Sequence, residues 1–388
     1  MKRIGSLFYF FMVFLGAIGF PASIYLSRVC FANKGLVSLI YLQTSTSFLA
    51  FLIQAGIRAG LRKEFLVGHL RIVNEVESYI KKTWVYIFPP LSVLSLFLMQ
   101  GYFLPTISAL NAILTLLIGL RLVQGRIKAA GFFSSILFLM NFSAGFFCLY
   151  FGNDRLAIGI VVEFFAFIIG IIFIYQNLPH INYRRGFNSL IKVLKKYVGL
   201  QISSFLIVFC SYIFAQIILR VSQTDKEIII LYSDAIIISG IMTMFLSRLM
   251  LIFEQKLVKS GRVESYLWLM HLSLLLTTLC ASLIRGGEYY EKMLFFLILL
   301  GLLGRYSSAL VSSFIQENMR GIFLRMTNAV VIFQVIMLLL NLCRIWYSSW
   351  IYFAAFINLF TLSVILLIIY SGKGIAYIVD VSRRNENY

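Results

Sequence analysis

The sequence is poor in charged residues, and acidic residues are especially few. Of its 388 residues 13% are charged and 61% are apolar, with a mean hydropathy of +0.92. An ordinary soluble domain is about 25% charged and about 45–50% apolar. A water-soluble globule of this composition would leave much of its apolar surface uncovered. The composition therefore excludes a soluble enzyme, a nucleic-acid-binding domain and a disordered scaffold.

Motifs for metal binding, disulfide frameworks and ATP hydrolysis are also missing. The five cysteines are dispersed and form no Cys-x-x-Cys pair. No His-Glu-x-x-His pattern occurs, and no phosphate-binding Gly-x-x-x-x-Gly-Lys-Ser/Thr loop. We therefore expect no metal, no cofactor and no ATP hydrolysis by this chain.

Long apolar segments occupy most of the chain. A membrane-spanning helix needs about 20 mostly apolar residues. We predict an all-α membrane protein with about twelve such helices, at 5–27, 36–57, 84–104, 106–124, 130–151, 156–176, 198–219, 228–247, 266–284, 293–314, 328–346 and 350–371. The basic and then apolar N-terminus has the pattern of a signal peptide, but because apolar segments continue to residue 371 we interpret it as the first span. Pro21 is expected to kink that span.

The distribution of lysine and arginine predicts the orientation. The net charge is +19, and with a cytoplasmic N-terminus the inner segments carry 25 of the 34 Lys and Arg residues and the outer segments carry 8; Arg305 lies within a span. Because positive residues collect on the cytoplasmic side, we predict a multi-pass protein of the cytoplasmic (inner) membrane with both termini inside. Anionic membrane lipids are expected partners.

Two inner segments are longer than the others. Residues 58–83 and 181–197 mix apolar residues at helical spacing with basic ones, which predicts helices at the cytoplasmic headgroup surface. The second lies near the middle of the chain. We therefore predict an N-terminal six-helix lobe over 1–180, a basic linker helix over 181–197 and a C-terminal six-helix lobe over 198–388.

A weak internal repeat supports two related lobes. Residues 26–41 resemble residues 219–234, and a shift of 192 residues superposes four identical pairs, among them Arg28 on Arg220 and Lys34 on Lys226. Both stretches follow the first span of a lobe. Lobes of six spans each share one orientation, as in the parallel repeats of two-lobed transporters, which bind substrate between the lobes near the midplane.

The same region carries a family resemblance. Arg28 and Gly35 in the first turn, a second span, and Gly56, Gly60 and Arg62 running into a cytoplasmic helix resemble the N-terminal pattern of polysaccharide flippases. The second half echoes the pattern at Arg220, Tyr232 and Ala235. The similarity is to O-antigen and exopolysaccharide flippases of the multidrug/oligosaccharidyl-lipid/polysaccharide exporter superfamily. The chain is short for that family and lacks its usual Leu-Gly-Pro turn.

The resemblance implies a fold and a substrate. The fold would be two six-helix lobes around a V-shaped cavity with alternating access. The substrate would be an oligosaccharide repeat unit linked through pyrophosphate to undecaprenol, carried to the outer leaflet for O-antigen or exopolysaccharide assembly. A polysaccharide polymerase and a chain-length regulator would be further partners.

Three charged residues stand out well inside predicted spans, away from their ends: Glu163, Asp234 and Arg305. Each costs about 2.5–3.5 kcal/mol on insertion scales, so each needs a stabilising role. We interpret Arg305 as a cation that binds the pyrophosphate, because a guanidinium can donate two parallel hydrogen bonds to phosphate oxygens. Glu163 and Asp234 are candidates for proton or ion coupling. The alternative for all three is a structural ion pair or a hydrogen bond to a neighbouring helix.

Further candidates lie at the ends of spans. Four arginines lie at cytoplasmic ends, where they would recruit the anionic lipid head or simply orient the protein: Arg58, Arg62, Arg121 and Arg248. Arg28 lies at an outer end, against the charge bias, and is a candidate for binding substrate. In-span amides, among them Gln54, Asn111 and Asn141, would bind sugar hydroxyls or hold helices together.

Three other functions stay open at this point. One is a purely structural membrane subunit, which the polar residues in the middle of spans disfavour. A membrane polysaccharide polymerase or glycosyltransferase also has ten or more spans, but usually carries a sizeable outer loop, and every outer loop here is short. A drug or cation antiporter of the same superfamily would use a carboxylate in the N-terminal lobe, for which Glu163 is the candidate.

Overall fold

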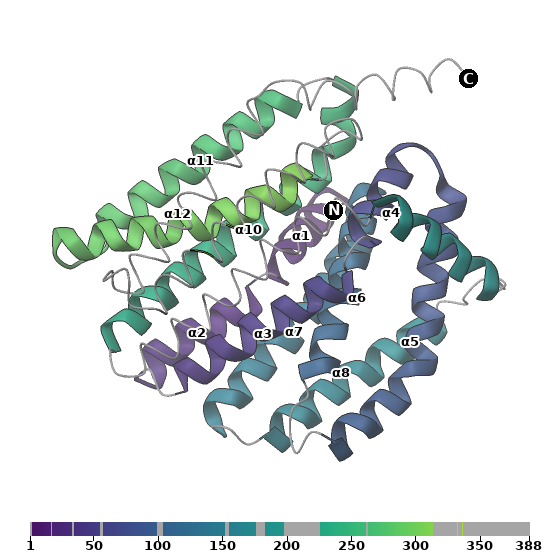
Figure 1. Ribbon diagram of the computed structural model, residues 1–388, viewed down its shortest axis with the longest axis horizontal. Helices are drawn as coiled ribbons and strands as arrows, with labels where there is room; N and C mark the ends of the chain where they lie inside the picture. The colour runs from purple at the N-terminus through teal and green to yellow at the C-terminus, as the bar shows by residue number, and fades with distance from the viewer. Residues whose placement is uncertain are drawn as a thin grey trace. The chain divides into compact units, whose positions relative to one another are not determined.

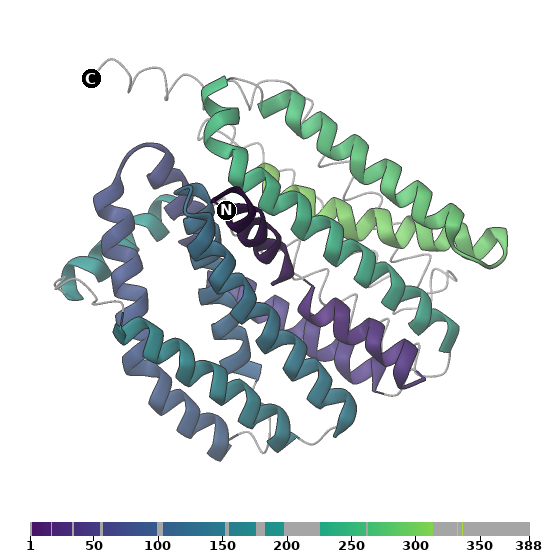
Figure 2. The ribbon, with the colours of Figure 1, turned by 180° about the vertical axis from the view of Figure 1, so that it is seen from behind.

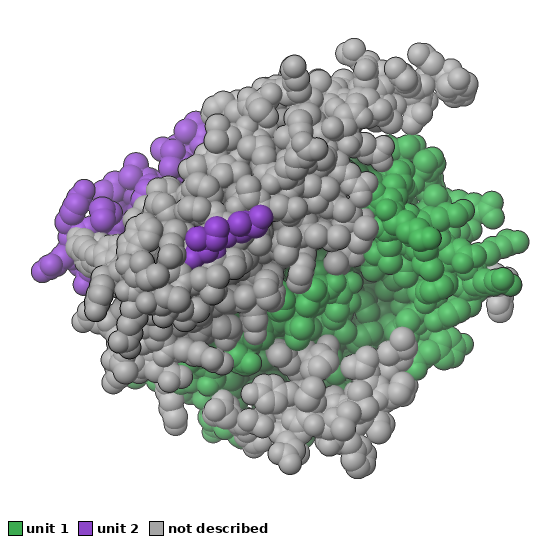
Figure 3. All heavy atoms as spheres, in the orientation of Figure 1, with its two compact units in different colours: residues 1–198 green, residues 199–388 purple. Residues whose placement is uncertain are grey.

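The computed structural model of the protein describes residues 2–16, 18–32, 35–54, 57–98, 104–151, 155–175, 183–197, 226–260 and 263–312, with residues 332 and 336. All regular secondary structure in these ranges is helical (Figure 1). The chain divides into two compact units, residues 1–198 and 199–388 (Figure 3). The predicted spans 198–219 and 350–371, and all but two residues of 328–346, lie outside the described residues.

The first unit contains eight labelled helices and a further helical segment. They are α1 (Lys2–Leu15), α2 (Gly19–Cys30), α3 (Leu36–Gln54), α4 (Ile57–Leu66), α5 (Leu70–Leu98), α6 (Leu104–Val123), α7 (Ile127–Tyr150), α8 (Arg155–Tyr175) and residues 183–197. The described part of the second unit contains α10 (Lys226–Ser260), α11 (Val263–Ile284) and α12 (Tyr289–Ser312). Helices α11 and α12 run side by side there, joined by a short turn (Figures 1 and 2).

Several described helices have the length and apolarity of membrane spans. They are α3, residues 106–123 of α6, α7 and residues 158–175 of α8. These agree with the spans predicted at 36–57, 106–124, 130–151 and 156–176. The protein is therefore a multi-pass membrane protein, and its regular secondary structure is helical throughout the described ranges. The total of twelve spans and the two-lobed, V-shaped arrangement remain predictions.

Helices α6 and α8 differ in how much of their surface the protein covers. The apolar window of α6 is 78% buried, whereas that of α8 is 28% buried. The exposed residues of α8 recur at spacings of three and four and so share one face: Ile160, Phe164, Phe167, Ile171 and Ile174. Helix α6 therefore lies inside the first unit, and α8 presents an apolar stripe suited to lipid acyl chains.

The first predicted span is broken. Helices α1 and α2 are each too short to cross a membrane, and only together do they have the length of a span. They are bent by 71° at the break between them. We expected the bend at Pro21, but α2 already begins at Gly19. Pro21 therefore occupies the first turn of α2, where its missing N–H would have no helical partner.

A serine of α7 holds the broken ends together. The Ser134 hydroxyl donates to the Val13 carbonyl at 2.7 Å and accepts a hydrogen bond from the Gly16 N–H at 3.1 Å. Backbone groups released by a helix break inside a membrane need such partners, because lipid supplies none. The break is therefore stabilised by a specific contact with α7.

Glycines let α2 and α7 approach closely on either side of this contact. A Cβ atom at Gly19 would lie 2.8 Å from the Asn141 Cβ, and one at Gly145 would lie 2.4 Å from the Ser23 hydroxyl oxygen. The Ser23 hydroxyl donates across the interface to the Phe142 carbonyl at 3.2 Å. Small residues and interhelical hydrogen bonds are the usual means of packing helices in lipid.

The prediction of one surface helix over 58–83 was wrong. Gly68, with a φ of +90°, ends the helical path between α4 and α5. Helix α5 then continues without interruption from Leu70 to Leu98 and so joins the rest of the predicted surface segment to the predicted third span.

Candidate functional site

Polar side chains of the first unit gather in what we call the polar layer. It consists of α4, residues 70–83 of α5, the end of α6 and residues 183–197. Ion pairs and hydrogen bonds join these segments. All of them come from regions predicted to face the cytoplasm. Their meeting places these regions together in the first unit, and the cytoplasmic orientation remains a prediction.

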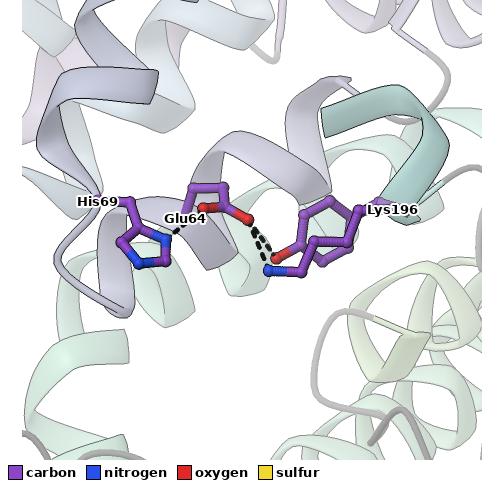
Figure 4. Close-up of polar contacts among 4 residues, drawn as sticks. Glu64, His69 and Lys196 are labelled. Atoms are coloured by element: carbon purple, nitrogen blue, oxygen red, sulfur yellow. Dashed lines mark hydrogen bonds and ion pairs between the residues drawn. The ribbon is translucent and has the colours of Figure 1, made fainter. Parts of the chain in front are cut away.

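The glycine that ends α4 also positions a histidine. The Gly68 N–H donates to the Phe65 carbonyl at 3.0 Å, and the His69 N–H donates to the Glu64 carbonyl at 2.9 Å. These two bonds form a Schellman cap, which requires a left-handed residue such as this glycine. The cap folds the chain back, so that His69 Nδ1 lies 2.6 Å from Glu64 Oε2 (Figure 4).

Glu64 is the centre of the most connected group in the polar layer. Its second oxygen accepts hydrogen bonds from Lys196 Nζ at 2.9 Å and from the Tyr197 hydroxyl at 2.8 Å (Figure 4). The Glu64 side chain is 4% exposed, whereas those of His69 and Lys196 are 52% and 44% exposed. We call these four residues the Glu64 cluster. It fastens residues 183–197 to α4.

The hydrogen bonds of the Glu64 cluster set its charge state. Burial alone would raise the pKa of Glu64, but the bonds from Lys196, His69 and Tyr197 outweigh burial and lower it below its ordinary value. Burial would lower the pKa of Lys196, but the bond to Glu64 raises it. Burial, and donation to Glu64, raise the pKa of Tyr197 to about 12. At neutral pH the cluster therefore holds a carboxylate, an ammonium and a neutral phenol.

A second buried carboxylate joins α5 to α6. Glu77 Oε1 lies 2.8 Å from Lys81 Nζ and also pairs with Arg121 Nη2. Arg121 Nη1 donates to Gln124 Oε1 at 2.6 Å. The side chains of Glu77, Lys81 and Arg121 are 8%, 8% and 11% exposed. Buried charges are stable only when paired in this way, so Arg121 serves this ion pair.

A third acidic residue joins α5 to residues 183–197. The Ser189 hydroxyl donates to Glu75 Oε2 at 2.6 Å, and Arg71 Nε donates to Glu75 Oε1 at 3.0 Å. The bond from Ser189 lowers the pKa of Glu75 against a smaller opposing effect of burial, and Arg71 lowers it further. Beside this contact the rings of Tyr79 and Tyr183 lie 4.7 Å apart.

Two glycines allow the close packing of residues 183–197. A Cβ atom at Gly60 of α4 would lie 2.4 Å from Val193 Cγ1 and 2.8 Å from Tyr197 Cδ2. A Cβ atom at Gly186 would lie 2.7 Å from the Tyr79 Cβ. Gly60 is one of the residues that carry the family resemblance, and in this chain its role is to admit the neighbouring helix.

The predicted cationic residues fall in both units. In the first unit Arg62 of α4 is buried, and Arg58 of α4 and Arg28 in the last turn of α2 are half-buried. In the second unit Arg248 of α10 is buried. Arg305 lies in α12, but its side chain lies outside the described part of the chain. Burial of Arg62 and Arg248 favours a structural role over recruitment of a lipid head.

Asp234 has a partner that the sequence did not indicate. Arg285, just after α11, places Nη1 2.7 Å from Asp234 Oδ2 of α10. The guanidinium also lies 4.9 Å from the centre of the Phe295 ring of α12. This ion pair matches the structural alternative for Asp234.

Glu163 is half-buried in the middle of α8, beside the exposed apolar stripe. Proton coupling by either residue remains a prediction.

Three in-span amides of the first unit make hydrogen bonds to neighbouring helices. Asn111 Nδ2 donates to Asn141 Oδ1 at 3.0 Å, and Asn141 Nδ2 donates to Asn111 Oδ1 at 2.9 Å. Gln54 Nε2 donates to the Ala112 carbonyl at 3.0 Å. All three side chains are buried. They therefore hold helices together, the second of the two roles considered for them.

The amide pair predicts a non-additive mutational effect. Asn111→Leu or Asn141→Leu alone leaves a buried amide without its partner, and should lower the free energy of unfolding by about 1–3 kcal/mol. The double substitution should cost clearly less than the two single costs together, because no amide is then stranded. Thermal unfolding of the purified protein in detergent micelles measures this. Additive costs would show that the two side chains act independently.

Sequence reasoning missed the Glu64 cluster. We placed no function on Glu64, and His69 belonged to no recognisable motif. One feature of the sequence could have indicated this cluster, namely the acidic residues of the basic segment 58–83. That segment contains three of the chain's 15 acidic residues: Glu64, Glu75 and Glu77. Carboxylates concentrated in a basic segment indicate ion pairing. The partners of Glu64 and Glu75 at residues 189, 196 and 197 are too distant in sequence to be identified by spacing.

A comparison of this chain with protein-family models, curated proteins and solved structures found no match. The family resemblance therefore rests on the residues quoted from the sequence.

Proposed function

We propose that this protein is a membrane transporter that moves polyprenyl-pyrophosphate-linked oligosaccharide repeat units from the inner to the outer leaflet of the cytoplasmic membrane. The substrate class comes from the sequence resemblance to polysaccharide flippases. The transport function has support from the fold as well, since the chain is all-helical and multi-pass where it is described, and divides into two units of similar length.

The observation that carries the proposal is the broken first span. Transporters use discontinuous helices near their substrate sites, because irregular backbone at membrane depth is tolerated only where protein or a watery cavity satisfies it. Here α1 and α2 are bent by 71°, and Ser134 of α7 binds backbone groups on both sides of the bend. A purely structural membrane subunit has no need of such a break.

In the proposed mechanism the chain supplies binding and orientation, with no covalent chemistry. Arg305 binds the pyrophosphate through its guanidinium. Arg28 and Arg58, which are half-buried, contribute positive potential along the route of the lipid head, whereas the buried Arg62 and Arg248 have a structural role. The polar layer holds residues 183–197, the described part of the linker predicted at 181–197, against α4 and α5 of the first unit.

A second candidate is cation- or proton-coupled antiport of a small molecule. The observation that favours it is Glu163, a carboxylate in the middle of a span-length apolar helix. An intramembrane carboxylate is a common element of such transporters.

Deletion of the gene tests the proposed function. The surface polysaccharide of the deletion strain is compared with that of the parent strain on a gel, and lipid-linked repeat units are extracted from both. We expect the polysaccharide bands to disappear and lipid-linked units to accumulate inside. A single repeat unit still reaching the surface would indicate a polymerase. An unchanged band pattern with increased drug sensitivity would favour antiport.

Complementation of the deletion strain tests Arg305. Arg305→Ala should abolish export while the protein inserts at normal levels, because the pyrophosphate loses its bidentate partner. Lys128→Ala, a cation in the first turn of α7, serves as the control and should restore the bands. Full restoration by Arg305→Ala would disprove the proposed role of this arginine.

A further inference from the structure

The helical segment 183–197 has one face that the protein covers completely. Its buried residues recur at spacings of three and four: Gly186, Ser189, Val193 and Tyr197. Each contacts α4 or α5, through the close approach of Gly60 and Gly186, the Ser189–Glu75 bond and the Tyr197–Glu64 bond. These contacts fix the rotation of the segment about its own axis.

The opposite side of the segment is basic and aromatic. Its exposed residues include four cations, namely Arg184, Arg185, Lys192 and Lys195. Tyr183 and Phe187, at its start, are 48% and 44% exposed although both rings also contact Tyr79. The segment contains no Asp or Glu. We call this surface the basic face; its rotation is set by the buried contacts.

We propose that the basic face binds the anionic headgroups of the membrane leaflet on its own side of the protein. Charge complementarity favours this occupant, because clusters of Lys and Arg beside membrane spans attract acidic lipids. The aromatic rings favour it too, since tyrosine and phenylalanine side chains on amphipathic helices insert at the headgroup boundary. The chain leaves a span-length helix at Tyr175, so the segment begins within a few residues of the membrane.

The consequence is a lipid-dependent anchor for the predicted linker. The Glu64 cluster and Ser189 hold one side of the segment to the first unit, and acidic lipids hold the other. The proposal concerns the surrounding leaflet and does not depend on which substrate is transported.

The test uses the full-length protein in nanodiscs made either of phosphatidylcholine alone or with a third of the lipid replaced by phosphatidylglycerol. Amide hydrogen exchange is measured over residues 183–197. We expect exchange there to be about tenfold slower in the anionic discs, and the difference to vanish at high salt.

Pairs of substitutions distinguish an effect of the basic face from an effect of the protein's overall positive charge. Lys192→Gln with Lys195→Gln should reduce the lipid-dependent difference to less than about twofold. Arg126→Gln with Lys128→Gln removes the same charge from two exposed cations at the α6–α7 turn, and should leave the difference intact. Lys192→Arg with Lys195→Arg keeps the charge and should behave like the unmodified protein, which excludes an effect of misfolding.

Three results would overturn the proposal. One is equal exchange in the two kinds of nanodisc. Another is an equal loss of protection in the Arg126 and Lys128 variant. The third is equal protection by inorganic pyrophosphate in phosphatidylcholine discs, which would make the basic face a site for soluble anions instead of a leaflet contact.

Discussion

Gly16→Ala is expected to destabilise the protein by about 1–3 kcal/mol, the usual cost of forcing an extra carbon into a packed interface. A Cβ atom at this position would lie 2.5 Å from the backbone carbonyl oxygen of Ser134. A backbone carbonyl cannot relieve the clash by changing rotamer, as a side chain can, so α7 must move away from the break. That movement also lengthens the bond from the Gly16 N–H to the Ser134 hydroxyl.

Gly170→Ala is the matched control for this prediction. It lies in α8, another apolar helix, and a Cβ atom there would meet nothing within 4 Å. Alanine should be neutral or slightly stabilising at this position, because it is a better helix former than glycine. Thermal unfolding in detergent micelles measures both variants. Equal melting temperatures for the two would mean that the contact between the break and α7 is not tight.

Glu64→Leu is expected to release residues 183–197 from α4. The substitution removes the acceptor of the hydrogen bonds from Lys196 and from the buried Tyr197 hydroxyl, at a cost of about 1–3 kcal/mol. Hydrogen exchange over residues 183–197 should accelerate about tenfold or more, since about 1.4 kcal/mol corresponds to a factor of ten. Glu64→Gln keeps an acceptor oxygen but not the charge, and should give an intermediate result.

The control for Glu64 is Glu288→Gln. Glu288 is an exposed carboxylate in the second unit, and its loss should leave exchange over residues 183–197 unchanged. If Glu64→Leu and Glu288→Gln gave the same exchange rates, the Glu64 cluster would not hold the segment.

Acid should weaken the same contact in the unmodified protein. The pKa of Glu64 is lowered in the folded state, so its contribution is fully present above the ordinary glutamate pKa of about 4.3 and is lost as the pH falls through the lowered value. Lys196 has a raised pKa, so its contribution is present below the ordinary lysine pKa and is lost only in strong base. The protection of residues 183–197, measured at each pH as the ratio of the intrinsic to the observed amide exchange rate, should therefore fall below about pH 4. Glu64→Leu should reduce this pH dependence and leave the part that comes from Glu75, whose pKa is also lowered and which binds Ser189 of the same segment.

The sequence predicted the positions of most described helices. Length, apolarity and Lys/Arg bias located α3, α6, α7 and α8 to within about three residues, because these features follow from the thickness and polarity of the bilayer. The predicted position of the bend between α1 and α2 was wrong. We placed it at Pro21, because proline is a stronger sequence signal for a kink than glycine, but α2 already begins at Gly19. What stabilises the break is Ser134, more than 100 residues away.

The candidate site was predictable only in its residue types. In-span charges are visible in a sequence, but their partners are not: Asp234 pairs with Arg285, 51 residues distant. Asn111 and Asn141 were visible as polar residues in spans, yet only the structure distinguishes an amide pair from a sugar-binding site. The Glu64 cluster depends on a glycine cap and on a helix 132 residues further along the chain. Such contacts are set by tertiary packing, which spacing in the sequence does not encode.

The most direct measurement of the central claim is translocation by the purified protein. It is reconstituted into liposomes that contain a polyprenyl-pyrophosphate-linked oligosaccharide with a fluorescent sugar, and a membrane-impermeant quencher is added outside. We predict that in vesicles with the protein the labelled lipids of the inner leaflet move to the outer leaflet, so that the quencher removes the fluorescence of both pools. In protein-free vesicles, and in vesicles with Arg305→Ala, only the outer pool should be quenched. An inner pool equally protected in all three kinds of vesicle would contradict the proposed flippase function.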